Sequence, residues 1–156
     1  MSDRPIQIRR AGPDDAAAIA RLLHDFNSEY AEPTPGVAAL SKHARQLLVD
    51  GEMTVLLAGE GPDGISLIRF RTAIWTGAPE AHLQELYVVP SRRGRGIGRA
   101  LLEVTMGAAR EAGATGIDLN TGTTDTAARA LYESCGFSNR EGAPDGPSML
   151  FYEREL

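Results

Sequence analysis

The segment Val89-Pro-Ser-Arg-Arg-Gly-Arg-Gly-Ile-Gly-Arg99 is the most informative part of this sequence. It follows a β-rich run and leads into an apolar pattern typical of a helix, from about Gly98 to Ala112. A glycine-rich turn at a helix start presents backbone N–H groups that bind phosphate or pyrophosphate without particular side chains. Arg93, Arg95 and Arg99 add positive charge there. The segment therefore predicts an anion-binding loop between a strand and a helix.

Two familiar phosphate-binding motifs do not fit this loop. A dinucleotide fingerprint needs G-x-G-x-x-G, but after Gly94 and Gly96 the third glycine position is occupied by Arg99. A Walker motif needs Gly-Lys followed by Ser or Thr, and the single lysine of the chain, Lys42, lies far from the loop. Neither motif therefore explains the loop.

Three segments together carry a resemblance to a known family. Residues 93–98 read R-x-x-G-x-G, the run Leu83-Gln-Glu-Leu-Tyr-Val-Val-Pro90 precedes them, and Ala128-Arg-Ala-Leu-Tyr-Glu-Ser-Cys-Gly-Phe137 follows with the pattern A-x-x-L-Y-E-x-x-G-F. In these motifs and in element order the chain resembles the GNAT superfamily of acyl-CoA-dependent N-acyltransferases, from about Ile6 to Leu156. The other interpretation of the loop is a solvated turn.

The pattern of apolar residues and turn signals predicts an alternation of strands and helices. The fold class is α/β, with a mixed, largely antiparallel sheet of about six or seven strands, flanked by about four helices, in the order β-α-α-β-β-β-α-β-α-β. The expected strands cover residues 6–9, 54–58, 65–75, 82–89, 116–120 and 149–153. The first expected helix begins at Pro13 and ends around residues 32–36. The other three cover residues 37–49, 98–112 and 125–135.

Composition limits the classes of protein that the chain can represent. Its 156 residues, 42% hydrophobic and 24% charged, predict one globular domain over residues 1–156. A net charge of -5 argues against a nucleic-acid binder, and no stretch approaches the ~20 apolar residues that span a bilayer. The lone Cys135 suits a reducing compartment, so we expect a cytoplasmic protein, and the resemblance makes a homodimer plausible.

The resemblance implies a donor site for acetyl-CoA. Backbone N–H groups of residues 93–99 would hold the pyrophosphate, and the pantetheine arm would pair with the edge of the strand at Tyr87, Val88 and Val89. A bulge N–H at about Val88 would polarise the thioester carbonyl. The pyrophosphate loop comprises Arg93, Gly94, Arg95, Gly96, Ile97, Gly98 and Arg99. Asp125 occupies a position where the family commonly has Asn. Asp is a good helix N-cap, so we favour that role for Asp125. The replacement puts an amide-type contact from this residue to the pantetheine in doubt.

The resemblance also implies acid and base candidates. Tyr132 matches the tyrosine that protonates the departing thiolate, the alternative being a ring packed on the sheet. Gln84 and Asn120 replace carboxylates found in relatives, which leaves Glu85 as the first candidate base, His82 as the second and Asp118 as the third. Strand alternation puts His82 and Glu85 on opposite faces unless a bulge re-aims one of them.

The function implied is an N-acetyltransferase that transfers acetyl from acetyl-CoA to a primary amine by direct attack in a ternary complex. The acceptor is a small molecule or a peptide that the sequence does not identify. The alternative is a catalytically weak acyl-CoA-binding or regulatory module on the same fold. The acceptor region is expected at about residues 26–37, 75–81 and 140–147, where several acidic residues would suit a cationic amine. No spacing of the three histidines suggests a metal site.

Overall fold

The structure, a computed structural model, describes residues 4–156. The chain divides into two compact units, Met1–Leu119 and Asn120–Leu156. A single domain over residues 1–156 stays a prediction.

The first unit contains a five-stranded sheet whose strands lie in sequence order. The strands are β1 (Ile8–Arg10), β2 (Thr54–Ala58), β3 (Gly64–Thr72), β4 (Pro79–Val88) and β5 (Ile117–Leu119). Neighbouring strands are antiparallel except β4 and β5, which are parallel. The parallel pair follows from the helical crossover that joins β4 to β5, whereas turns of a few residues join β2, β3 and β4.

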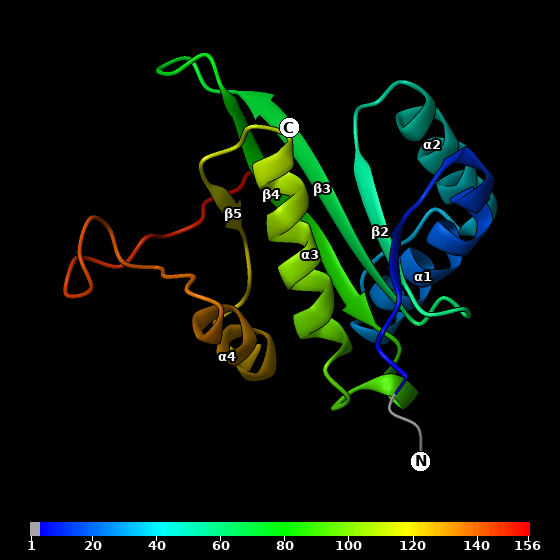
Figure 1. Cartoon of the computed structure of the whole chain (residues 1–156). Coiled ribbons are helices and arrows are strands. Elements are labelled where there is room, and N and C mark those ends of the chain that lie inside the picture. The colour runs from blue at the N-terminus through cyan, green and yellow to red at the C-terminus, as the bar shows by residue number, and fades with distance from the viewer. Residues whose placement is uncertain (1–3) are drawn as a thin grey trace. The chain divides into compact units, whose positions relative to one another are not determined.

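Helices cover both faces of this sheet, as Figure 1 shows. One face is covered by α1 (Ala16–Glu29) and α2 (Val37–Val49), and the other by α3 (Ile97–Glu111). Short 3₁₀ turns precede α1 and α3, at Pro13–Asp15 and Pro90–Arg92, where proline is tolerated because the first N–H of a helix has no partner.

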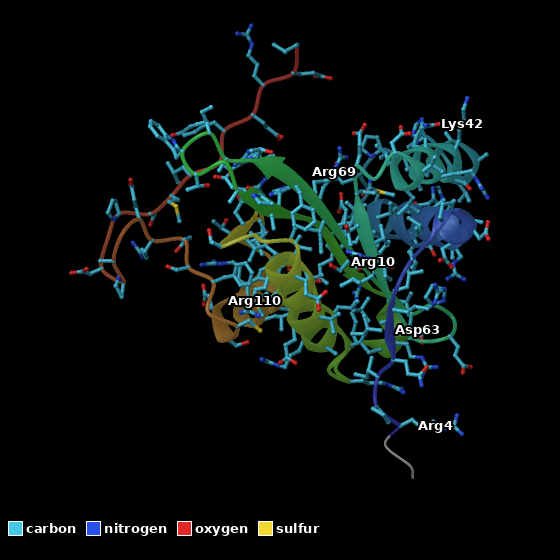
Figure 2. The ribbon with its side chains drawn as sticks, turned by 45° about the horizontal axis from the view of Figure 1, so that its top comes forward. Arg4, Arg10, Lys42, Asp63, Arg69 and Arg110 are labelled. Atoms are coloured by element: carbon cyan, nitrogen blue, oxygen red, sulfur yellow. The ribbon has the colours of Figure 1, made fainter. Side chains whose placement is uncertain are left out.

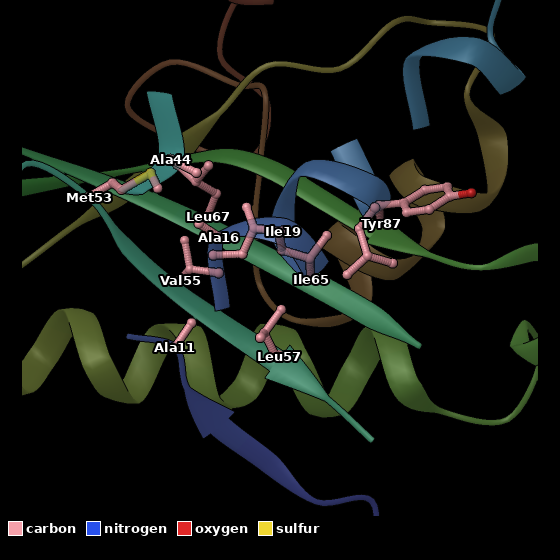
Figure 3. Packing of buried hydrophobic residues seen from close by; sticks show 11 residues of the cluster. Ala11, Ala16, Ile19, Ala44, Met53, Val55, Leu57, Ile65, Leu67 and Tyr87 are labelled. Carbon is pink, nitrogen blue, oxygen red and sulfur yellow. The ribbon is translucent and has the colours of Figure 1, made fainter. Parts of the chain in front are cut away.

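Two layers of apolar side chains hold the helices to the sheet. Against α1 and α2 lie Ile65, Leu67 and Tyr87, and Figure 3 shows the Tyr87 hydroxyl pointing away from the other labelled side chains. Against α3 lie Leu56 and Ile68. Successive strand residues point to opposite faces, so the odd-numbered residues 65–71 of β3 face α1 and α2, and the even-numbered ones face α3.

The second unit contains α4 (Thr126–Ser134) and an isolated antiparallel bridge between Arg140 and Ser148. The predicted strand over residues 149–153 is wrong. Met149 donates its N–H to the carbonyl of Asn139 at 2.7 Å, but no ladder continues from there, and Leu150 and Tyr152 are exposed. A strand needs a hydrogen-bonded partner as well as a suitable pattern, so residues 4–156 contain five strands rather than six or seven.

Several predicted boundaries also move. The first strand begins two residues later and ends one residue later than predicted, β3 ends at Thr72 rather than Trp75, and β4 begins at Pro79 rather than His82. Trp75 lies in the β3–β4 turn with its side chain 94% exposed. These shifts reflect hairpin pairing, which places Thr72 opposite Pro79.

Candidate active site

A β-bulge in β4 re-aims the candidate bases. Leu67 pairs with Glu85 and Ile68 pairs with Leu83, so Gln84 is an extra residue without an opposite partner on β3. His82 lies opposite Arg69 and Glu85 opposite Leu67, and both partners point toward α1 and α2. His82 and Glu85 therefore share one face of the sheet, and the alternation that separated them does not hold across Gln84.

The predicted bulge at Val88 is wrong, since Val88 pairs regularly with Gly64. Val89 donates its N–H to the carbonyl of Asp63 at 2.9 Å, so alternation turns the N–H of Val88 toward the other edge of β4. β5 pairs with β4 only at residues 81–83. Within the described sheet, residues 84–88 thus present an edge that no strand occupies.

A cavity of about 250 Å³ lies beside the bulge, between β3, β4, α1 and α2. Its apolar lining comes mainly from the two helices and comprises Leu23, Pro35, Leu40, Ala44, Leu47, Met53 and Leu67. Its polar lining comprises Asn27, Thr34, His43, Arg69, Gln84 and Glu85. Figure 2 shows Arg69 beside β3 on the side of α2. The cavity therefore reaches the strand segment where β5 leaves β4.

Glu85 has the electrostatics of a general base. Burial raises the pKa of its carboxyl above the usual range, and the nearby His82 opposes this shift only in part. A raised pKa brings the carboxylate closer to the acidity that suits proton transfer near neutral pH. Glu85 also lines the cavity, so it lies where a bound acceptor would be.

His82 lies near the start of β4, in a row of polar side chains that contact one another. Its Nδ1 lies 2.5 Å from Oδ1 of Asp118, which β5 places directly beside it. A carboxylate accepts hydrogen bonds, so the Nδ1–H of His82 donates to Asp118. Arg71 lies 3.9 Å from the same carboxylate and donates to Glu80 at 2.9 Å. Asp118, the third predicted base, therefore orients His82.

The glycine-rich loop has the predicted shape. Gly94 and Gly96 have φ values of +75° and +82°, a left-handed conformation that side chains disfavour, and Gly96 directly precedes α3. The N–H of Ala100 donates to the Gly96 carbonyl at 3.0 Å, so the N–H groups of Ile97 and Gly98 lie before the first intrahelical bond. Buried Ile97 anchors this helix start against Leu101. The loop can therefore present N–H groups to an anion.

Arg93 makes contacts that differ from its predicted ones. Its backbone N–H donates to Pro90 at 3.3 Å, which makes it part of the 3₁₀ turn. Its side chain donates from Nε to the Val88 carbonyl at 2.9 Å and from Nη2 to Glu29 at 2.7 Å, and lies 5.6 Å from the centre of the Tyr87 ring. This pairing lowers the pKa of Glu29. Arg93 thus holds the loop to β4 and to the end of α1.

Sequence reasoning missed the partner of Arg93. Glu29 lies in the expected acceptor region at about residues 26–37, but no motif marks it as the partner of Arg93. It lies 64 residues from Arg93, and no local pattern signals a pair at that separation. The cavity residues His43 and Arg69 were missed for the same reason.

Tyr132 and Asp125 belong to the second unit. Asp125 directly precedes α4 as predicted, but its side chain makes no capping hydrogen bond; instead its carbonyl accepts the N–H of Arg129 at 3.0 Å. Tyr132 is half-buried on α4, with its ring 5.8 Å from that of Phe137. The roles of both residues in catalysis and in acetyl-CoA binding stay predictions.

Residues 4–156 contain no group of three or more His, Cys, Asp or Glu side chains placed to hold a metal ion. Over the same residues, no helix is both long and apolar enough to cross a bilayer.

Comparison with known proteins identifies the family of the chain. The model of the acetyltransferase (GNAT) family matches residues 18–137, which include the cavity, the bulged strand and the glycine-rich loop. The chain belongs to this family and is an N-acetyltransferase of the GNAT type. The family implies the use of acetyl-CoA.

Individual relatives extend over most of the chain. The crystal structure of a protein from Arthrobacter sp. FB24, described as a proposed acetyltransferase, is 44% identical, with a TM-score of 0.89 over 100% of this chain and 99% of that one. An aminoglycoside N(6')-acetyltransferase type 1 from Stenotrophomonas maltophilia is 32% identical over 86% of this chain and 87% of its own length. A mycothiol acetyltransferase from Beutenbergia cavernae is 36% identical over 82% of this chain and 50% of its own length.

Proposed function

We propose that this chain transfers the acetyl group of acetyl-CoA to a primary amine by direct attack in a ternary complex. One observation carries the proposal: Glu85 lines the cavity directly beside the strand edge that β5 leaves, and the bulge at Gln84 brings His82 to the same face of the sheet. An acceptor in the cavity and a thioester at that edge would meet at a carboxylate with a raised pKa. In this reaction a C–N bond forms, the C–S bond breaks, the amine loses a proton and the thiolate gains one.

The donor side of the site fits acetyl-CoA. The N–H groups of the loop from Gly94 to Gly98 would hold the pyrophosphate, and exposed Arg95 and Arg99 would add positive charge. The outward N–H groups of Leu86 and Val88 would pair with the pantetheine arm, as an added strand pairs with a sheet edge. Because Arg93 donates to the Val88 carbonyl, that carbonyl is already satisfied within the protein.

The acceptor side supplies the base. A protonated amine must lose a proton before it attacks, and Glu85 is the first candidate because it lines the cavity and has a raised pKa. His82, held by Asp118 on the same face of the sheet, is the second candidate. Tyr132 is proposed as the acid that protonates the thiolate.

The pH dependence of kcat/KM tests the assignment of the base. Glu85→Gln is expected to lower kcat/KM about 10²–10⁴-fold and to abolish the limb on which the rate rises with pH, because an amide accepts no proton in this range. His82→Ala is expected to keep that limb. Glu80→Gln is the matched control, since Glu80 is a carboxylate of the same strand that pairs with Arg71 outside the cavity.

Two results would contradict the proposal at different levels. A wild-type limb in Glu85→Gln, together with its loss in His82→Ala, would transfer the role of base to His82. Absence of CoA release with acetyl-CoA and every amine of a broad panel would contradict amine acetylation itself. It would then favour an acyl-CoA-binding module.

A further inference from the structure

The lining of the cavity carries information on the acceptor. Its walls are mostly hydrocarbon: Leu40, Leu47 and Pro35 come from α2 and the segment before it, and Met53 and Leu67 come from the sheet side. Met53 and Leu67 are only 6% and 5% exposed, so this wall is part of the packed core. An apolar wall gains free energy from contact with an apolar group and none from contact with a hydroxyl or an ammonium.

Several polar side chains at the cavity are already bonded within the protein. Asn27 donates from its amide to the Pro33 carbonyl at 2.8 Å. The Thr34 hydroxyl lies 3.1 Å from Nδ1 of His24 and accepts the N–H of Gly36 at 3.2 Å. These groups shape the segment between α1 and α2, which leaves them less able to bind the hydroxyls of a sugar.

The charges favour an acceptor with a single positive charge. Among the described residues that line the cavity, Glu85 is the one carboxylate and Arg69 is a cation, held 3.3 Å from Glu52. One ammonium can therefore lie at Glu85, whereas further ammonium groups in the cavity would meet Arg69 or hydrocarbon. Burial of an unpaired charge against hydrocarbon is strongly unfavourable.

The size of the cavity limits the apolar group. Its volume of about 250 Å³ lies below the usual range of ~300–1,000 Å³ for sites of drug-sized ligands. It exceeds the ~150 Å³ apolar cavity that is known to hold benzene. A single aromatic ring or a branched alkyl group with a short amine arm fits this volume.

We infer that the acceptor is a compact monoamine with one apolar substituent, an arylalkyl or branched-alkyl amine, whose amine lies at Glu85 and whose substituent contacts Leu40, Leu47 and Leu67. This inference rests on the proposed function, because it assigns a substrate class to the same site. The inferred acceptor differs from the aminoglycoside that appears in the name of the Stenotrophomonas maltophilia relative.

The test measures CoA release and acceptor binding with four probe amines: 2-phenylethylamine, isopentylamine, spermidine and kanamycin. We expect kcat/KM for the first two to exceed the values for spermidine and kanamycin at least about tenfold. Leu40→Ser is expected to raise KM for 2-phenylethylamine about tenfold and to leave KM for acetyl-CoA unchanged. Leu48→Ser is the matched control, because Leu48 is another half-buried leucine of α2 and lies outside the cavity lining.

Each outcome separates the inference from the proposed function. A higher kcat/KM with spermidine or kanamycin, or equal effects of Leu40→Ser and Leu48→Ser, would overturn the inference and leave amine acetylation standing. Saturable binding of 2-phenylethylamine, weakened by Leu40→Ser but without CoA release, would support the ligand class assigned to the cavity and contradict the proposed function. Absence of both binding and turnover of the two apolar amines would overturn the inference.

Discussion

At the residue scale, the site depends on how neighbours change the acidity of single carboxylates. Burial raises the pKa of Glu85, whereas the Arg93 guanidinium lowers that of Glu29. The first shift suits a proton acceptor near neutral pH, and the second keeps a structural ion pair charged. We therefore expect different roles for the two glutamates, a proton acceptor for Glu85 and a structural ion pair for Glu29.

Tyr132 is expected to act on turnover more than on binding. Tyr132→Phe keeps the ring contact with Phe137 and removes the hydroxyl that would protonate the thiolate. We expect kcat to fall about 10²-fold or more and Kd for acetyl-CoA to stay nearly constant, as measured by steady-state kinetics and calorimetry. Tyr152→Phe, at a tyrosine of the same unit that is 83% exposed, is the control. An unchanged kcat in Tyr132→Phe would remove this residue from the mechanism.

Asp15 is expected to contribute to stability in a pH-dependent way. Arg9, at 2.7 Å, and the Gly12 N–H lower its pKa to about 2. Because this folded-state pKa lies below the unfolded value near 4, the contribution is present above about pH 4 and is lost as the pH falls toward 2. With allowance for solvent screening, Asp15→Asn should destabilise the fold by about 1 kcal/mol at pH 7.

The Tm measured against pH checks this expectation. Asp15→Asn should show a shallower decline of Tm between pH 5 and pH 2 than the wild type. Asp14→Asn is the control, since that carboxylate is fully exposed and lies 3.9 Å from Arg45. Parallel curves for Asp15→Asn and the wild type would show that the ion pair does not stabilise the fold.

At the element scale, β4 and the loop that follows it carry most of the site. The bulge at Gln84 turns two candidate bases to one face, and the open edge of residues 84–88 leads to the glycine-rich loop. Arg93 then holds this loop to the strand through the Val88 carbonyl. The candidate bases and the proposed donor site therefore lie on one continuous segment, whereas α1 and α2 supply most of the cavity lining.

The loop glycines are expected to be required for their backbone conformation. Gly96→Ala and Gly94→Ala place a side chain at positive φ, which costs about 1–2 kcal/mol each and should weaken binding of CoA. Gly107→Ala on α3 is the control, because a Cβ there meets open space and alanine favours a helix by about 0.5–1 kcal/mol. Calorimetric Kd values and Tm measure both effects. Equal CoA affinities in Gly96→Ala and Gly107→Ala would contradict a binding role for the loop conformation.

At the scale of the whole molecule, a ligand of the native state should stabilise the chain. At ligand concentrations 100-fold above Kd, acetyl-CoA and CoA should each add about 2.7 kcal/mol to the free energy of unfolding, which raises Tm by about 5–10 °C. NAD is the control, since the loop lacks the third glycine of the dinucleotide motif. Thermal unfolding with each ligand measures this. No shift with acetyl-CoA or CoA would contradict the donor site.

Features that neighbouring residues encode could be predicted from the sequence alone. The family, the order of the elements up to the last helix, a helix start near Gly98 and the turn at Gly94 and Gly96 follow from short motifs, because local backbone preferences depend on adjacent residues. The prediction of a final strand was wrong although the residue pattern suits a strand, because no partner strand pairs with residues 149–153.

Only the tertiary structure decided which of these residues meet. The bulge position follows from the register of β3 against β4, which is selected by packing both faces of the sheet at once. The pair of Glu29 and Arg93 and the lining of the cavity join residues far apart in sequence. Such contacts have no local signal, because burial and charge pairing select them after the elements have formed. For that reason the sequence identified the candidate bases but not their common face.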